Sequence, residues 1–171
     1  MALEDEALSL LRNRYDNYPK SLDAFQEFAV RHPDAAFCAA WQFVTDVTEE
    51  IDDGTCCFVL ETSAKALGQS AVERKILEFW QQLGEFARLN VIDGIGSQTA
   101  ISTELGIKLF HDPTTTVRER HRIVAGFAAG HPNRRVDNID ALSNEIGSYS
   151  DPEQQKTLDR FRAELVRNPQ T

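Results

Sequence analysis

The residues best suited to chemistry in this chain are arginines grouped in its final third. They form two groups, with a histidine inside the first: Arg118, Arg120, His121, Arg122, Arg134 and Arg135. Arg118 and Arg122 are four residues apart, so on a helix they share one face. A guanidinium group is a planar fork of donors that suits carboxylates and phosphates. We expect Arg118 to serve the fold, and Arg134 and Arg135 to face a ligand.

Other residue types that carry catalysis lack the required spacing. The sequence has no phosphate loop, dinucleotide fingerprint, nucleophile elbow or paired-carboxylate motif. The acidic residues between 46 and 53 lack the alternating ligands and central glycine of a calcium loop. Four histidines and three cysteines do not follow zinc spacing, and we expect Cys56 and Cys57 to lie in a helix contact. The sequence therefore predicts a protein that is not an enzyme and needs no cofactor or metal.

Length and composition indicate one globular domain over residues 1–171. The chain is 42% hydrophobic and 26% charged, which is typical of a folded protein. No apolar run approaches the ~20 residues that cross a bilayer, so membrane insertion is not expected. Glu4, Asp5 and Glu6 stand where a signal peptide needs positive charge. Three cysteines make no disulfide framework, so we expect a cytoplasmic protein with reduced thiols.

The net charge of −9 is distributed unevenly. Residues 1–60 contain 12 acidic and 4 basic residues (−8), residues 61–116 contain 7 and 5 (−2), and residues 117–171 contain 8 and 9 (+1). The acidic first part disfavours contact with nucleic acids or anionic membranes. Only the final third offers a basic surface.

Nearly every segment has helical periodicity, which predicts an all-α protein. Nine helices are expected, near residues 3–16, 21–31, 34–51, 55–67, 70–89, 97–110, 114–128, 134–147 and 152–167. Ser21 is the expected N-cap of the second helix, and Gly68 the expected C-cap of the fourth. Phe86 is placed on the buried stripe of the helix over 70–89. Gly94 and Gly96 are expected to break the chain after it.

A short segment of the sequence occurs twice. Residues 100–106 (Ala-Ile-Ser-Thr-Glu-Leu-Gly) return 41 residues later as 141–147 (Ala-Leu-Ser-Asn-Glu-Ile-Gly). A period of roughly 40 residues with one helix pair per unit is typical of an α-solenoid. We expect a right-handed α-solenoid of about four helical hairpins, closed by a capping helix over 152–167. The alternative is an irregular helical bundle.

Residues 112–167 resemble HEAT-type helical repeats. The motifs that carry the resemblance are Asp112-Pro113, Val117-Arg118, residues 126–132 (Gly-Phe-Ala-Ala-Gly-His-Pro), residues 139–142 (Ile-Asp-Ala-Leu) and Asp151-Pro152. The resemblance implies that an Asp-Pro turn opens the first helix of each unit and that a Val-Arg pair packs near its start. It also implies that arginines bind turn carbonyls and the acidic residues of neighbouring units.

The same segment partly resembles a DNA-reading helix-turn-helix. Ser102, Leu105, Gly106 and Ile107 match its first half, but Pro113 would break the recognition helix. We therefore do not expect this motif. A nucleic-acid-binding helical protein that uses the basic final third remains the alternative function.

The pattern as a whole favours an adaptor or scaffold that binds another protein or a peptide. Solenoids usually bind along the concave face, which the helices near 97–110 and 134–147 would line. The predicted binding residues are Thr103, Glu104, Arg122, Arg134, Arg135, Asn138 and Asn144.

Overall fold

The structure, a computed structural model, is all-helical over the residues that it describes. These are residues 2–13, 20–48, 50–96 and 102–129, with nine further positions: 140, 141, 144, 152, 155, 156, 159, 160 and 163. The helices are α1 (Leu3–Arg12), α2 (Lys20–Arg31), α3 (Pro33–Thr45), α4 (Asp53–Leu67), α5 (Gln69–Phe79), the 3-10 turn η1 (Trp80–Gln82), α6 (Glu85–Gly96), α7 (Thr103–His111) and α8 (Val117–Ala129). The nine further positions are also helical.

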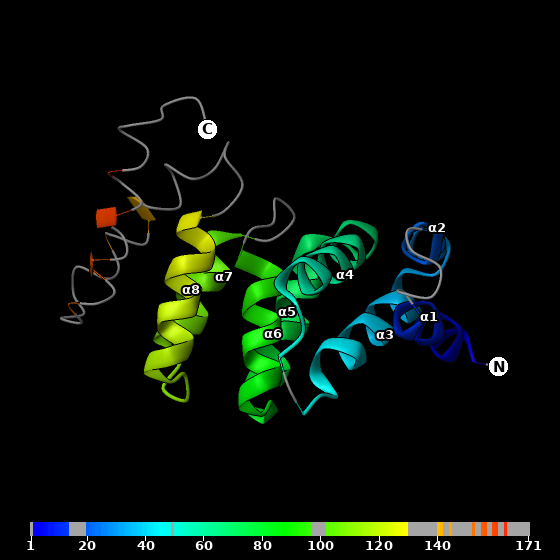
Figure 1. Cartoon of the computed structure of the whole chain (residues 1–171), viewed down its shortest axis with the longest axis horizontal. Coiled ribbons are helices and arrows are strands. Elements are labelled where there is room, and N and C mark those ends of the chain that lie inside the picture. The colour runs from blue at the N-terminus through cyan, green and yellow to red at the C-terminus, as the bar shows by residue number, and fades with distance from the viewer. Residues whose placement is uncertain are drawn as a thin grey trace.

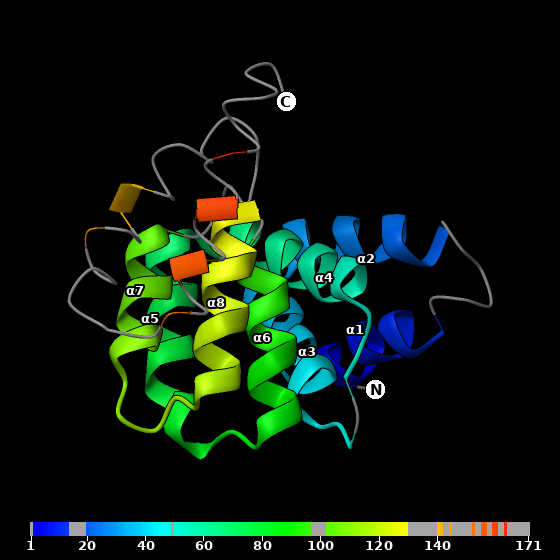
Figure 2. The ribbon, with the colours of Figure 1, turned by 60° about the vertical axis from the view of Figure 1, so that its left-hand side comes forward.

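The helices follow one another in chain order along the long axis of the molecule. α1 and α2 lie at one end and α7 and α8 towards the other (Figure 1). The most extensive contacts join α1 to α3, α3 to α4, α4 to α6, and α6 to α8. α2 packs on α1 and α3, α5 on α4, and α7 on α8. The second view shows α7, α8 and α6 side by side in that order, with α5 partly hidden behind α7 (Figure 2).

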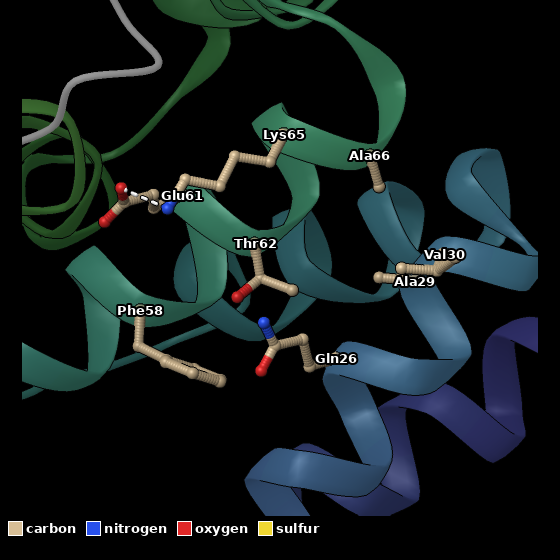
Figure 3. Close-up of a pocket in the computed structure, with 8 residues that line it drawn as sticks. All are labelled: Gln26, Ala29, Val30, Phe58, Glu61, Thr62, Lys65 and Ala66. Atoms are coloured by element: carbon tan, nitrogen blue, oxygen red, sulfur yellow. Dashed lines mark ion pairs between the residues drawn. The ribbon is translucent and has the colours of Figure 1, made fainter.

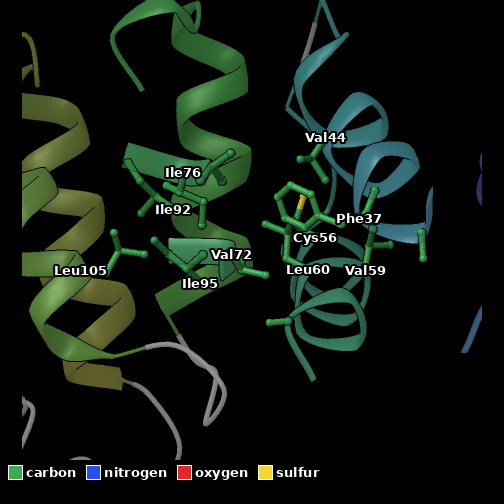
Figure 4. Close-up of a cluster of buried hydrophobic side chains, with 14 of the residues drawn as sticks. Phe37, Val44, Cys56, Val59, Leu60, Val72, Ile76, Ile92, Ile95 and Leu105 are labelled. Carbon is green, nitrogen blue, oxygen red and sulfur yellow. The ribbon is translucent and has the colours of Figure 1, made fainter. Parts of the chain in front are cut away.

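One contiguous core runs through this stack. It begins at Leu11 of α1 and Phe25 of α2 and passes through the contact between α4 and α6 to Phe127 of α8. Figure 4 shows its middle part, where Cys56 and Leu60 of α4 lie between α3 and α6. Cys56 is fully buried, as expected for a cysteine in a helix contact. Because burial is continuous, adjacent helices stabilise one another along the whole stack.

Several helix ends follow from local sequence. The Asp52 carboxylate accepts a hydrogen bond from the Thr55 amide at 2.8 Å and so caps α4. Gly68 ends α4 with φ +96°, and its amide donates to the Ala64 carbonyl at 2.9 Å, which confirms the predicted C-cap. The Ser102 hydroxyl accepts from the Leu105 amide and caps α7.

The prediction of one helix over 70–89 is wrong. α5 ends at Phe79, η1 follows, and α6 begins at Glu85. The Trp80 carbonyl accepts hydrogen bonds from the Leu83 amide and from the buried Arg88 side chain. These donors take the place of the amide four residues later, which would bind this carbonyl in a continuous α-helix. Because of this break, the residues of α6 do not continue the buried stripe of α5, and Phe86 is 40% exposed.

Gly94 does not break the chain, because it lies inside α6, whereas Gly96 is the last residue of that helix. A Cβ atom at Gly94 would lie 2.9 Å from the Cys56 carbonyl oxygen and 2.5 Å from Leu60 Cδ1. Glycine is therefore present because the backbones of α4 and α6 approach closely here.

Three further expectations are also corrected. α2 begins at Lys20, so Ser21 lies within the helix and does not cap it. α3 ends at Thr45, six residues before the expected end, because Asp46 and the residues after it form a loop towards α4. Val117, which the HEAT resemblance implies to be packed, is 66% exposed because the buried stripe of α8 runs through Ile123, Val124 and Phe127.

The close approach at Gly94 gives a test of the packing between α4 and α6. We expect Gly94→Ala to lower the free energy of unfolding by about 1–3 kcal/mol, because the new methyl group meets the Cys56 backbone. Gly84→Ala is the matched control: nothing lies within 4 Å of its Cβ position, and we expect at most ~1 kcal/mol of stabilisation. Urea denaturation followed by circular dichroism measures both. Equal stabilities would mean that the two helices are not in close contact.

Candidate binding surface

Arg122 of α8 is bound to α6 by a two-pronged ion pair. Its Nε lies 2.6 Å from Asp93 Oδ1, and its Nη2 lies 2.6 Å from Asp93 Oδ2. The Asp93 side chain is only 8% exposed, whereas that of Arg122 is 42% exposed. The bidentate geometry and the burial of the carboxylate make this a well-formed pair. Arg122, predicted to bind a partner, thus joins two helices.

Arg118 lies one turn before Arg122 and contacts two carboxylates. Its Nη1 is 2.8 Å from Glu85 Oε1, and its Nη2 binds Glu50, which precedes α4. Glu50 also lies 3.3 Å from Arg122 Nη2, so this carboxylate bridges both arginines. The hydrogen bond to Glu85 raises the pKa of Arg118, with a further contribution from Glu50. These pairs agree with the expectation that Arg118 serves the fold.

Arg120 binds a backbone carbonyl group of α7. Its Nε donates to the Phe110 carbonyl at 3.0 Å, and its guanidinium lies 5.7 Å from the centre of the Phe110 ring. The three arginines at the start of α8 thus contact the two neighbouring helices, α6 and α7, and the loop that contains Glu50. The guanidinium groups of Arg118 and Arg122 already donate to carboxylates of the protein. A nucleic-acid phosphate would have to compete with these carboxylates for the same donors.

The other predicted binding residues are placed as follows. Thr103 and Glu104 lie in the first turn of α7, where Glu104 is exposed and Thr103 half-buried. Glu104 Oε1 lies 2.7 Å from Lys108 Nζ, and the hydrogen bond from Lys108 lowers the pKa of the Glu104 carboxyl. Asn144 is helical and exposed. Arg134, Arg135 and Asn138 lie outside the described residues.

The acidic loop after α3 is fixed to α6 by one buried side chain. Asn90 is fully buried; its amide nitrogen donates to the Val44 carbonyl at 3.0 Å, and its amide oxygen accepts from the Ile51 amide at 2.9 Å. Together with the pair between Glu50 and Arg118, this holds residues 50 and 51 against α6 and α8. Within the described part of the chain, no group of three or more histidine, cysteine or acidic side chains could hold a metal ion.

A groove between α2 and α4 was not anticipated from the sequence. It is lined by Gln26, Ala29, Val30, Phe58, Glu61, Thr62, Lys65 and Ala66, and it has a volume of about 210 Å³ (Figure 3). Val30 stands at its edge with 76% of its surface exposed. The helical periodicity of α2 contains one indication of this exposure. Its buried stripe runs through Phe25, Phe28 and Ala29, and Val30 lies outside that stripe.

A second hollow lies between the start of α1 and the start of α3. It has a volume of about 490 Å³ and is lined by Ala2, Leu3, Glu4, His32, Pro33, Asp34 and Ala35. Two of its lining residues, Glu4 and Asp34, are acidic.

No protein-family model, curated protein or solved structure matches this chain. Within the described residues, no helix is both long and apolar enough to cross a membrane.

A stability measurement tests whether Arg122 is structural, as its ion pair with Asp93 indicates, or binds a ligand, as the sequence predicted. We expect Arg122→Gln to lower the free energy of unfolding by about 1–3 kcal/mol, because it leaves the nearly buried Asp93 carboxylate without its main partner. Arg118→Gln is the matched control and should cost clearly less, because Arg118 and Glu85 are both more than half exposed. Urea denaturation of both variants gives the comparison. An Arg122→Gln protein as stable as the wild type would return Arg122 to the list of ligand-binding residues.

Proposed function

We propose that the protein is a non-enzymatic adaptor or scaffold, built as an α-solenoid of HEAT-like repeats. The observation that carries the proposal is the stacking of the helices in chain order. The main contacts run from α1 to α3, then to α4, α6 and α8. Such stacking builds an elongated surface from neighbouring units. Solenoids commonly use surfaces of this kind to bind other proteins.

Two further observations support the repeat interpretation. The segment over 100–106 returns at 141–147, and in the first copy it includes the start of α7. Arg118 and Arg122 of α8 bind acidic residues of α6, and Arg120 binds the carbonyl of Phe110 at the end of α7. The HEAT resemblance implies this use of arginines between neighbouring units.

The proposed partner is another protein or a peptide, bound at the surface that includes the start of α7. Thr103 and Glu104 are accessible there, and Asn144 is exposed further along the chain. From the sequence alone, we also assign Arg134, Arg135 and Asn138 to the proposed binding residues. Arg122 supports it indirectly, because its donors already hold α8 against α6.

The test is capture of partners by the tagged protein from its native lysate, with and without nuclease, followed by mass spectrometry. We expect a stoichiometric protein partner that survives nuclease treatment. The double variant Arg134→Glu/Arg135→Glu should lose this partner, because it reverses the charge of both proposed contacts. The matched control is Arg74→Glu/Lys75→Glu, an adjacent basic pair on α5, which should keep it.

Circular dichroism establishes that both double variants fold. If nuclease removes every partner, the adaptor function is wrong and the basic final third becomes the site of nucleic-acid binding. If the Arg134→Glu/Arg135→Glu variant captures the partner as well as the wild type does, these two arginines do not belong to the binding surface.

A further inference from the structure

The hollow between the start of α1 and the start of α3 combines an apolar lining with two carboxylates. Its apolar lining residues are Ala2, Leu3, Pro33 and Ala35, and Leu3 is 46% exposed. Its volume of about 490 Å³ lies within the ~300–1,000 Å³ of ligand sites, so it can accept side chains of a bound segment. The hollow lies at the α1 end of the stack, away from α7 and α8 (Figure 1).

The charged side chains that line this hollow are acidic. Glu4 and Asp34 are both exposed, and none of the described lining residues is a lysine or an arginine. Within the described part of the chain, neither carboxylate forms an ion pair. The remaining polar lining residue is His32, whose ring centre lies 5.0 Å from that of Phe28. Two unpaired carboxylates beside an apolar surface complement a ligand that has both basic and apolar groups.

The position of these acids at helix starts explains their occurrence only in part. Glu4 lies in the first turn of α1 and Asp34 in the first turn of α3, where the helix dipole favours negative charge. Other first-turn acids of the fold also pair with arginines of the chain: Glu85 of α6 with Arg118, and Glu119 of α8 with Arg88. The two acids of the hollow differ because they have no such partner and border an apolar surface.

Two comparisons favour this hollow over the other described ones for a basic ligand. In the groove between α2 and α4, the acidic lining residue Glu61 is paired with Lys65 at 2.7 Å. The hollow between α1 and α2 has Lys20 as the one charged side chain among its described lining residues. Residues 1–60 sum to −8, so the field around the α1 end attracts basic partners and repels acidic ones.

We propose that this hollow binds a basic, amphipathic segment of a partner protein. An apolar side chain of the segment lies against Leu3 and Ala35, and flanking basic side chains pair with Glu4 and Asp34. Arginine suits these flanking positions, because its fork binds carboxylates and its stem covers apolar surface. The inference rests on the proposed adaptor function and gives the adaptor a second partner, at the opposite end of the stack from α7.

The experiment measures binding of a fluorescein-labelled peptide of Arg-Leu-Gly repeats to the full chain by fluorescence anisotropy. We expect a micromolar dissociation constant that rises at least ~10-fold between ~50 and ~500 mM salt, because the ion pairs are accessible to solvent. Peptides of Glu-Leu-Gly and of Arg-Ser-Gly repeats remove the basic and the apolar groups in turn. Each should bind at least ~10-fold more weakly.

A double variant tests whether the peptide binds at the hollow. Glu4→Gln/Asp34→Asn should weaken binding of the Arg-Leu-Gly peptide roughly 5- to 30-fold, because it removes two accessible ion pairs. The matched control is Asp23→Asn/Glu78→Gln, which removes the same charge from exposed positions on α2 and α5 that do not line the hollow. The control should bind as the wild type does, and circular dichroism establishes that both variants fold.

Four outcomes overturn the proposal. The first is no binding of the Arg-Leu-Gly peptide at low salt. Equal binding of the Arg-Ser-Gly peptide, or an equal loss in both double variants, would mean that long-range charge alone attracts the peptide. Self-association of the chain that Glu4→Gln/Asp34→Asn abolishes would make a second copy the occupant. The capture experiment with Arg134→Glu/Arg135→Glu concerns other residues, so failure of the adaptor function and failure of this site are distinguishable.

Discussion

The second half of the described fold depends on the buried guanidinium of Arg88. Its Nε donates to the Trp80 carbonyl at 3.2 Å, its Nη1 donates to the Thr114 carbonyl at 2.8 Å, and it stacks 5.0 Å from the Trp80 ring. Glu119 Oε2, almost fully buried, lies 3.6 Å away and balances the charge. Removing either partner would leave an uncompensated charge in the interior, which is among the most destabilising changes that a protein can suffer. One side chain thus fixes the turn before α6, the turn before α8 and the distance between them.

The proposed adaptor function depends on this rigidity. An adaptor surface must hold its contacts in fixed positions, because every side chain that is ordered on binding costs affinity. Arg122 and Glu50 extend the same connection to the surface, so α8 is joined to α6 both inside and outside the core. At the other end, α2 is held in the core by Phe25 and Phe28, which are buried.

Local patterns predicted the helices well and their boundaries less well. Apolar periodicity located helices close to α1, α2, α4, α7 and α8, and Gly68 was identified as a C-cap because the chain itself requires φ > 0 there. The break between α5 and α6 was not predicted, because it depends on contacts of Trp80 with Arg88, in the next helix, and with Thr115, 35 residues further along the chain. Gly94 was read as a breaker because its role depends on the backbone of α4, which periodicity does not reveal. Val30 was overlooked for a similar reason: a groove exists only once two helices have packed.

Glu119 performs two tasks with one carboxylate. In a capping box, its Oε2 accepts from the Thr116 amide at 2.7 Å, while its own amide donates to the Thr116 hydroxyl at 3.2 Å. The same Oε2 faces Arg88 of α6. The first turn of α8 therefore cannot fray without also exposing the arginine between the helices. The ends of helices usually open with the lowest free energy of any local motion in a folded chain. Here the opening of this helix end is coupled to the separation of α6 from α8.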